Sequence, residues 1–341
     1  MQALILAGGE GTRLRPLTER IPKPIVPLAG RPHIAYVIDW LEGHGVDDVV
    51  VSGGHLATEL REALDDIAGP TVRFAEEPDA RGTAGAIRFA EDMLGDRFLV
   101  INGDVLCDLD LGAMIEQHER TGARATIALY PVEDPSNYGL VHRSEDGEIS
   151  EFLEKPGPDQ IDTDEINAGA YLLERSVLDL IPPDRAVSIE REVFPKLVGE
   201  GLYGRRLEGY WIDIGTPARY LQANWDILEG RVGTVRAEAV TDGVLVEEGA
   251  RTDGAALSPP ALVGFDASLA AGAAVGPRAV IGAESEIGES ARVSESVLLP
   301  KCRIGEGAEV GGAILSTGVR VEPGGVVQPG AVIGAGEVVG A

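Results

Sequence analysis

The sequence predicts an α/β domain with a mostly parallel mixed sheet, followed by a three-sided parallel β-helix. Two observations support this prediction. Between residues 33 and 131, short apolar segments alternate with amphipathic helical ones, and short loops join them. Such alternation is typical of a sheet with helices on both faces. From Leu257 onward, aliphatic residues recur every six residues apart from two five-residue steps, and this period suits a triangular coil with one inward side chain per side.

The elements of the first domain follow from apolar periodicity and from breaker residues. An apolar run at 3–7 predicts the first strand, and Asp146-Gly147 between two short strands predicts a hairpin. Pro217 is expected to open a helix that extends to about Leu228, because proline is favoured at the first helical position. Further helices are expected at 33–41, 56–66, 84–94 and 111–121, and further strands at 47–52, 71–75, 97–102 and 124–131.

A glycine-rich turn follows the first strand and carries Gly8, Gly9 and Gly11. Glycine lets the backbone adopt positive φ and lets a ligand approach closely, and successive N–H groups in such a turn form an anion nest. Arg13 and Lys23 follow soon after. The alternative is an ordinary strand-to-helix turn, but the prolines of this segment favour an extended chain. The sequence therefore predicts a phosphate-binding segment.

The charge balance points to the same segment. The net charge is −27, yet the first 31 residues carry five cations and two acids. A polyanionic substrate would be drawn to this region, whereas nonspecific nucleic-acid binding is not expected of so acidic a chain. Only four residues are lysines, and acid-rich, lysine-poor surfaces suit a high-salt cytoplasm. A halophilic source is therefore a hypothesis, which full stability and activity in dilute buffer would contradict.

The compartment is expected to be the cytoplasm. No apolar run approaches the ~20 residues that cross a bilayer, and no signal peptide or membrane partner is expected. The two cysteines, Cys107 and Cys302, lie far apart in the sequence. So few thiols suggest a reducing environment rather than a disulfide framework.

Residues 8–18 read GGEGTRLRPLT and residues 22–32 read PKPIVPLAGRP. These strings resemble the signature of the sugar-1-phosphate nucleotidyltransferases, which have a Rossmann-like domain, join an NTP to a sugar 1-phosphate and release diphosphate. The resemblance implies catalytic roles for Arg13, at the outer phosphates, and for Lys23, at the reacting phosphate. It also implies that the nucleotide is bound by Leu6, Ala7, Gly8, Gly9, Gly11, Thr12 and Arg13.

Two acids are candidate metal ligands. Asp104 follows a buried strand at the edge where ligands are expected, so it could bind Mg²⁺, or form an Asx-turn, or cap the helix at 111–121. Asp213 lies in an apolar strand, where an unpaired carboxylate would cost several kcal/mol. Residues 102–105 (NGDV) and 211–217 (WIDIGTP) resemble the metal-binding segments of the family. The resemblance implies that Asp104 and Asp213 hold Mg²⁺.

Other family strings concern the sugar and the base. Residues 152–156 (FLEKP) imply that Glu154 binds sugar hydroxyls and Lys155 the sugar phosphate, although a solvated ion pair is the alternative. Asn167 and Gly139 resemble sugar-pocket residues, and a strand-edge hydrogen bond is the alternative for Asn167. The base is expected to meet Glu77, Gly82 and Thr83. Residues 79–81 depart from the family pattern there, and Thr83 could instead cap a helix.

The C-terminal repeat resembles the left-handed parallel β-helix of hexapeptide-repeat proteins. Some of these are acyltransferases that use a histidine, but none of the five histidines lies in the repeat. Assembly into a homo-oligomer, or regulation, is therefore the expected role. His33, His44, His55 and His118 are expected on helix surfaces or in turns. The repeated positions are Leu257, Val263, Leu269, Val275, Ile281, Ile287, Val293, Leu298, Ile304, Val310, Leu315, Val321, Val327, Ile333 and Val339.

The expected domains are 1–230 for nucleotidyl transfer, 231–256 as linker or first coils, and 257–341 for the β-helix. The chain most resembles the mannose-1-phosphate guanylyltransferases, which make GDP-mannose from GTP. Glucose-1-phosphate uridylyl- or thymidylyltransfer is one alternative. The other is a non-catalytic regulatory subunit that binds NDP-sugar. Such a subunit would be expected to lack some of the charged residues Arg13, Lys23, Asp104 and Asp213, and all four are present.

Overall fold

The computed structural model describes residues 1–65, 67–234 and 243–340. Contacts divide the chain into two compact units. The first comprises Met1–Glu10 and Ile34–Trp211, and the second comprises Gly11–His33 and Ile212–Ala341. The segment after Glu10 therefore belongs to the same unit as the C-terminal coils. Among the described residues, no helix combines the length and the apolarity that crossing a bilayer requires.

The first unit contains a nine-stranded mixed sheet. β1 (Gln2–Leu6) pairs in parallel with β4 (Asp48–Gly53) and β6 (Arg97–Asn102), and the sheet becomes antiparallel where β11 (Glu165–Glu174) joins β6. The predicted α/β fold is confirmed, and the predicted hairpin is the antiparallel pair β9–β10. The remaining strands of the sheet are β5 (Thr71–Glu76), β8 (Ala125–Pro131), β9 (Gly139–Arg143), β10 (Ile149–Glu154) and β12 (Leu202–Arg206).

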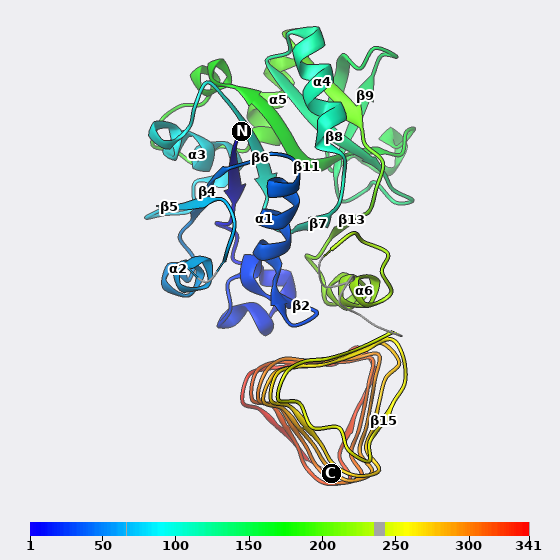
Figure 1. Ribbon diagram of the computed structural model, residues 1–341. Helices are drawn as coiled ribbons and strands as arrows, with labels where there is room; N and C mark the ends of the chain where they lie inside the picture. The colour runs from blue at the N-terminus through cyan, green and yellow to red at the C-terminus, as the bar shows by residue number, and fades with distance from the viewer. Residues whose placement is uncertain (66, 235–242, 341) are drawn as a thin grey trace. The chain divides into compact units, whose positions relative to one another are not determined.

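Helices of this unit lie close to their predicted ranges (Figure 1). The predicted helix at 84–94 is shorter than expected: α3 ends at Phe89, and a 3₁₀ turn at Glu91–Met93 follows. The side chain of Asp110 caps α4 by accepting the N–H of Gly112 at 2.8 Å, so Asp104 is not the cap of that helix. The helices are α1 (His33–Gly43), α2 (Ala57–Asp65), α3 (Gly82–Phe89), α4 (Leu111–Thr121) and α5 (Phe194–Leu197).

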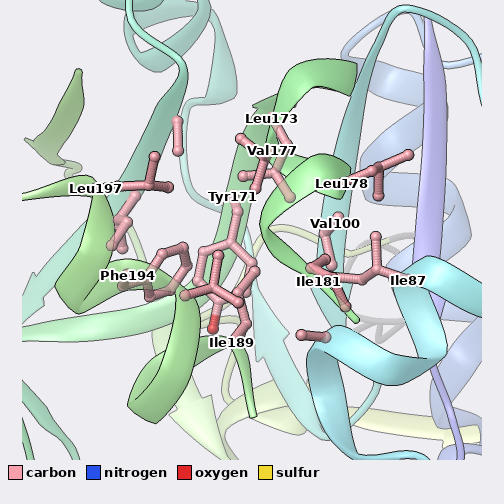
Figure 2. Close-up of a cluster of buried hydrophobic side chains, with 14 of the residues drawn as sticks. Ile87, Val100, Tyr171, Leu173, Val177, Leu178, Ile181, Ile189, Phe194 and Leu197 are labelled. Carbon is pink, nitrogen blue, oxygen red and sulfur yellow. The ribbon is translucent and has the colours of Figure 1, made fainter. Parts of the chain in front are cut away.

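Aromatic and aliphatic side chains from strands and helices form the core on one face of this sheet. Figure 2 shows Tyr171 of β11 beside Phe194 of α5, with Ile87 of α3 and Val100 of β6 in the same cluster. The rings of Tyr171 and Phe194 are both fully buried, and their centroids lie 5.0 Å apart. Edge-to-face packing of this kind adds to the hydrophobic gain from burial.

Phe194→Ala is expected to lower the free energy of unfolding by about 3–5 kcal/mol, because it removes a fully buried ring and leaves a cavity. Urea unfolding monitored by circular dichroism measures the change. Phe89→Ala is the control, since Phe89 is 37% exposed and its loss is expected to cost about 1 kcal/mol or less. Equal losses for the two variants would contradict the assignment of Phe194 to the core.

The second unit begins with the predicted phosphate-binding segment. The expectation that its prolines keep it extended is wrong over three 3₁₀ turns, at Thr12–Leu14, Leu17–Glu19 and Lys23–Ile25. The fixed φ of proline is compatible with a 3₁₀ turn as well as with an extended chain. Two short strands follow, β2 (Pro27–Leu28) and β3 (Arg31–Pro32).

Helix α6 (Pro217–Leu228) begins and ends where the sequence predicts, with Thr216 as its N-cap. The hydroxyl of Tyr220 donates a hydrogen bond to the carbonyl of Pro27 at 2.6 Å, and the side-chain oxygen of Asn224 accepts the N–H of Ala29 at 2.7 Å. Asn224 is fully buried. These bonds fasten the segment after Lys23 to one side of α6.

The C-terminal part of this unit is a parallel β-helix of three sheets with six, five and five strands, seen as a triangle in Figure 1. The predicted left-handed β-helix is thus confirmed. Its strands are β14 (Val244–Val246), β15 (Ala256–Leu257), β16 (Ala261–Val263), β17 (Ser268–Leu269), β18 (Ala274–Val275), β19 (Ala279–Ile281), β20 (Glu286–Ile287), β21 (Arg292–Ser294), β22 (Val297–Leu298), β23 (Arg303–Ile304), β24 (Glu309–Gly311), β25 (Ile314–Leu315), β26 (Arg320–Val321), β27 (Val326–Val327), β28 (Val332–Ile333) and β29 (Val338–Val339).

Every aliphatic residue of the six-residue repeat packs in the interior of the coil or against it. β14 pairs in parallel with β16, so the residues from Val244 onward already belong to the first coils. On the six-stranded sheet the outward side chains are apolar and buried as well, namely Leu262, Val280, Val297 and Ile314.

The prediction for the histidines is wrong at two positions. His33 and His118 are buried rather than on the surface, with 0% and 1% exposure. His118 contacts the hydroxyl of Thr126 through Nδ1 at 2.8 Å and a carboxylate oxygen of Glu174 through Nε2 at 3.2 Å. Burial lowers the pKa of His118, because it disfavours the charged imidazolium. Its polar partners explain how it is accommodated in the core.

Candidate functional site

The glycine loop leaves the carboxyl end of β1, and the sequence fixes its path. The N–H of Ala7 donates to the carbonyl of Ser52 at 2.7 Å. A Cβ at Gly8 would lie 3.2 Å from Oε1 of Glu77, and one at Gly11 would lie 2.9 Å from Cγ2 of Thr18. Gly11 also has a φ of +62°. Glycine is therefore strongly favoured at position 11, whereas a side chain at position 8 would require the Glu77 carboxylate to shift by a few tenths of an ångström.

Glu77, predicted to meet the base, is buried beside this loop with 6% exposure. Its Oε1 accepts a hydrogen bond from the hydroxyl of Ser52 at 2.9 Å. Burial raises the pKa of Glu77, although the bonds from Ser52 and the backbone N–H of Arg81 partly offset this effect. The result is a fixed acceptor close to Gly8.

Thr83 does not cap α3, because the N-cap is Arg81 and no side chain caps this helix. Its hydroxyl instead donates to a carboxylate oxygen of Glu190 at 2.8 Å and accepts the N–H of Ile189 at 2.8 Å. A Cβ at Gly82 would lie 2.7 Å from the carbonyl of Val187. The contacts of Gly82 and Thr83 thus join the start of α3 to residues 187–190.

The predicted sugar-site residues come from the β9–β10 hairpin and from β11. Gly139 pairs with Glu154, and a Cβ at Gly139 would lie 2.7 Å from the ring of Phe152. Burial raises the pKa of Glu154, and the nearby charge of Glu190 acts in the same direction. Lys155 adopts a φ of 55°, and its N–H donates to the carbonyl of Tyr138 at 3.0 Å.

Asn167 lies on β11, which pairs with β9 at the adjacent residues Ile166 and Leu140. Its side chain donates to the hydroxyl of Tyr171 at 2.9 Å and accepts the N–H of Gly169 at 2.9 Å. These local bonds fix the orientation of the Asn167 amide. The topology of the first unit therefore brings Gly139, Glu154 and Asn167 to neighbouring strands.

An aromatic cluster adjoins these residues, and the sequence reasoning missed it. The rings of Tyr130 and Trp211 stack with centroids 5.6 Å apart, and Tyr138 meets Trp211 edge-on at 5.5 Å. The indole N–H of Trp211 donates to the carbonyl of Ala168 at 2.8 Å. The available sequence signals were the place of Trp211 in the family string at 211–217 and the position of Tyr130 near the end of a predicted strand.

Asp104 follows β6 at the carboxyl end of the central strands. The N–H of Gly103 donates to the carbonyl of Leu6 at 2.9 Å, and a Cβ at Gly103 would lie 2.6 Å from that oxygen. The chain can therefore pass close to the end of β1 only because residue 103 is glycine. This contact places the half-buried Asp104 next to the end of β1.

In the second unit the structure brings Arg13, Lys23 and Asp213 together. Asp213 Oδ2 lies 3.9 Å from Arg13 Nη2, and Asp213 Oδ1 lies 4.0 Å from Lys23 Nζ. Arg219, which the sequence reasoning did not single out, has Nη1 3.9 Å from Oδ2 of the same carboxylate. The side chain of Asp213 is only 14% exposed. We call Arg13, Lys23, Asp213 and Arg219 the charged cluster.

Gly215 leaves room for this cluster. Its N–H donates to Asp213 Oδ1 at 2.7 Å. A Cβ at this position would lie 2.7 Å from Arg13 Nη2 and 2.7 Å from Asp213 Oδ1. Any larger residue at 215 would push the arginine or the carboxylate away.

The predicted site residues thus fall into two sets, one in each compact unit. In the first unit are Leu6, Ala7, Gly8, Gly9, Glu77, Gly82, Thr83, Asp104, Gly139, Glu154, Lys155 and Asn167. In the second are Gly11, Thr12, Arg13, Lys23 and Asp213. Each set combines glycines that leave space for a ligand with charged side chains, and the cations of the second set, Arg13 and Lys23, could bind an anion.

Comparison with known proteins agrees with this chemistry. Residues 2–230 match the family Nucleotidyl transferase, and residues 257–340 match the family GMPPB C-terminal domain. The mannose-1-phosphate guanyltransferase of Yarrowia lipolytica is 41% identical over 229 residues, which are 65% of this chain and 62% of that protein. The mannose-1-phosphate guanylyltransferase of Mycobacterium tuberculosis is 36% identical over 269 residues, which are 77% of this chain and 73% of that protein.

Among solved structures, HddC from Yersinia pseudotuberculosis is similar with a TM-score of 0.58 and 32% identity, covering 65% of this chain and 97% of that one. The same protein complexed with GMP-PN gives a TM-score of 0.57. The chain spans less than two thirds of the length of the Yarrowia relative. Since the family match covers residues 2–230 of 341, the chain belongs to the nucleotidyl transferase family and carries a GMPPB C-terminal domain.

Proposed function

We propose that this nucleotidyltransferase makes GDP-mannose and diphosphate from GTP and mannose 1-phosphate. The charged cluster is the observation that carries this proposal. Three cations have a nitrogen 3.9–4.0 Å from one carboxylate, which gathers positive charge at one place in a chain of net charge −27. A triphosphate is the kind of anion that such a cluster would attract, and guanidinium groups match phosphate oxygens. The relatives named mannose-1-phosphate guanylyltransferase support the choice of substrates.

Glu77 supports GTP as the nucleotide. An ionised carboxylate only accepts hydrogen bonds, and the guanine edge offers two neighbouring donors, N1–H and the 2-amino group. Uracil and thymine offer a single N–H between two carbonyl oxygens, which a carboxylate would repel. The buried carboxylate beside Gly8 therefore suits guanine better than either pyrimidine.

The sugar phosphate is assigned to the residues of the β9–β10 hairpin and β11. Glu154 would accept sugar hydroxyls, Lys155 would neutralise the sugar phosphate, and the backbone at Gly139 and the oriented amide of Asn167 would complete the contacts. The aromatic cluster of Tyr130, Tyr138 and Trp211 provides an apolar surface nearby. Sugar rings present C–H faces that pack on such surfaces.

Members of this family generally use a divalent metal, and we propose Mg²⁺ held by Asp104 and Asp213. The residues fit this ion, because Mg²⁺ in phosphate sites needs only one or two carboxylates besides substrate oxygens and water. When bound, Mg²⁺ would neutralise negative charge on the phosphate oxygens.

The chemistry needs no side-chain nucleophile. A phosphate oxygen of mannose 1-phosphate attacks the α-phosphorus of GTP in line, and the bond from that phosphorus to the β-phosphate oxygen breaks. The electron pair leaves with diphosphate, so GDP-mannose and diphosphate balance the reaction. Lys23 would neutralise the α-phosphate in the transition state and Arg13 the departing diphosphate. Positioning and charge neutralisation thus account for the catalysis.

Lys23→Ala is expected to lower kcat at least tenfold, equivalent to about 1.4 kcal/mol or more, because the side chain acts on the reacting phosphate. Steady-state release of diphosphate measures the effect. Lys196→Ala is the matched control, since Lys196 is exposed on α5 and its loss should leave kcat unchanged. A change in KM alone would show that Lys23 only binds the nucleotide.

A panel of GTP, UTP and dTTP with mannose and glucose 1-phosphates tests the proposed function through diphosphate release. GTP with mannose 1-phosphate is expected to give the highest kcat/KM. Preference for UTP or dTTP with glucose 1-phosphate would replace the proposed specificity by the alternative one. If NDP-sugar bound tightly while no pair turned over, the chain would be a regulatory subunit.

The family matches also support domains at 1–230 and 257–341. We propose that the β-helix joins copies of the chain into a homo-oligomer, which sedimentation equilibrium of the full chain would test by its mass. A cytoplasmic setting agrees with the free thiols of Cys107 and Cys302. Burial raises the pKa of both thiols to about 12, so they remain protonated and unreactive.

A further inference from the structure

We propose that the C-terminal coil positions the segment that carries Lys23, and that Arg278 is the positioning residue, acting through helix α6. This inference rests on the proposed nucleotidyl transfer, in which Lys23 acts on the reacting phosphate. It goes further by giving the coil a part in that reaction besides assembly. The coil, α6 and the Lys23 segment all belong to the second compact unit.

The backbone of the coil fixes the starting point of the Arg278 side chain. Its N–H donates to the carbonyl of Pro260 at 2.6 Å, and the parallel pairing of β16 with β19 begins at the next residue, Ala279. The side chain then reaches the end of α6. Nε donates to Glu229 Oε1 at 2.7 Å, and the guanidinium carbon lies 5.4 Å from the centroid of the Trp225 ring.

Glu229 receives this contact as the C-cap of α6. A carboxylate is disfavoured at this end of a helix by the helix dipole, so its place there depends on cations. Arg278 supplies one, and Arg231 supplies the other, with Nη2 2.7 Å from Glu229 Oε2. The side chain of Glu229 is only 17% exposed. Short, charge-assisted bonds of this kind are among the stronger polar contacts in proteins, and they hold the last turn of α6 to the coil.

The middle of the same helix holds the segment that follows Lys23. Asn224 precedes Trp225, is fully buried, and accepts the N–H of Ala29 at 2.7 Å. One turn earlier, the hydroxyl of Tyr220 donates to the carbonyl of Pro27 at 2.6 Å. Helix α6 therefore contacts the coil at its end and residues 27–29 along its length.

The position of Lys23 depends on these bonds. The N–H of Val26 donates to the carbonyl of Lys23 at 3.2 Å, so the turn with Lys23 leads directly into the bonded stretch. Ala29 has a φ of 43°, a left-handed conformation that residues other than glycine rarely adopt. Such a conformation persists only where its surroundings fix it. Loosening the contact of α6 with the coil would let Ala29 relax and would displace Lys23.

The competing explanation is that Arg278 only stabilises the fold. Its loss would then lower Tm but leave kcat unchanged at temperatures where the protein stays folded. A positioning role predicts a lower kcat with an unchanged KM for sugar phosphate, because the proposed sugar residues belong to the first unit. It also predicts that Arg278→Met adds little to the loss of kcat in a Lys23→Ala background, since the two changes act through the same group.

The experiment combines steady-state kinetics with amide hydrogen exchange of the full chain, read in peptides spanning residues 24–32. Arg278→Met is expected to speed exchange at Ala29 at least tenfold, because opening of this stretch becomes easier. It should lower kcat at least fivefold and keep the sugar-phosphate KM within twofold. Arg278→Lys retains a charged donor and should recover part of both losses. The control is Arg292→Met, whose arginine is 74% exposed on the coil.

Exchange at Ala29 within twofold of the wild-type rate in Arg278→Met, or equal acceleration in Arg292→Met, would overturn the proposal. So would faster exchange with an unchanged kcat in an active enzyme, since Arg278 would then be a structural anchor. If the methionine variant fails to fold, Glu229→Gln replaces it, because the amide keeps an acceptor for Arg278 and loses only the charge. Hydrogen exchange needs no turnover. Accelerated exchange in a chain that turns over no substrate pair would therefore refute the proposed function while supporting the link between coil and segment.

Discussion

Asp213→Asn is expected to lower kcat at least a hundredfold, which corresponds to about 2.7 kcal/mol in the activation barrier. The substitution keeps the size of the side chain but removes its charge. Arg13, Lys23 and Arg219 would then lose the carboxylate that they face at 3.9–4.0 Å, and the proposed metal would lose one anionic ligand. The nucleotide could still bind the cations, so the main loss should be in kcat rather than in KM.

The fold is expected to survive this change. The carbonyl oxygen of asparagine can still accept the N–H of Gly215, which now donates to Asp213 at 2.7 Å. Thermal unfolding checks this expectation, and Asp253→Asn, at an exposed position on the coil, is the matched control. Near-normal turnover in Asp213→Asn with intact folding would remove Asp213 from the reaction. Asp104→Asn is expected to reduce turnover in the same way.

Much of the fold could be predicted because it depends on local patterns. The six-residue repeat identifies the side chains that point into the coil. Fifteen such positions fix the register between neighbouring strands of the coil. Both ends of helix α6 could be predicted because its signals are local in the sequence. Pro217 marks its start, and the spacing of its apolar residues marks its extent. Prolines are less informative, since their φ is compatible with both the expected extended chain and the observed 3₁₀ turns.

Features that depend on packing between distant residues could not be predicted. The contact of Arg219 with Asp213 forms only because helix α6 places Arg219 beside that carboxylate. The ring pair Tyr130–Trp211 likewise joins residues that are 81 positions apart in the sequence. The sequence of its helix suggests a surface position for His118. Its partners Thr126 and Glu174 lie on strands β8 and β11, which the sequence around His118 does not reveal. A single sequence contains the residue types of such contacts but not the distances between them.

Glu77→Gln is expected to lower kcat/KM for GTP about 10–100-fold, since a good bidentate contact to a base contributes about 1–3 kcal/mol of discrimination. The amide would place an NH₂ group against one of the two guanine donors. The same amide offers both a donor and an acceptor, which match the pyrimidine edge, so kcat/KM for UTP should rise. The ratio of kcat/KM for GTP to that for UTP should therefore fall by more than kcat/KM for GTP itself. Initial rates with each nucleotide at saturating mannose 1-phosphate measure both effects.

The stability of the same variant gives a second, independent test. Burial raises the pKa of Glu77, so the ionised carboxylate destabilises the fold at pH values above that raised pKa. As the pH falls through the window between the raised pKa and the ordinary value, the wild-type carboxyl binds its proton and the penalty disappears. Glu77→Gln should therefore raise Tm at neutral pH, and the gain should shrink as the solution is acidified.

Glu76→Gln is the matched control for both measurements, because Glu76 is exposed and pairs with Arg61 on the surface. It should change neither the nucleotide preference nor Tm appreciably. If Glu77→Gln raised Tm at neutral pH while the nucleotide preference stayed the same, the carboxylate would be buried as described but would not bind the base. The choice of GTP would then depend on other groups around the glycine loop.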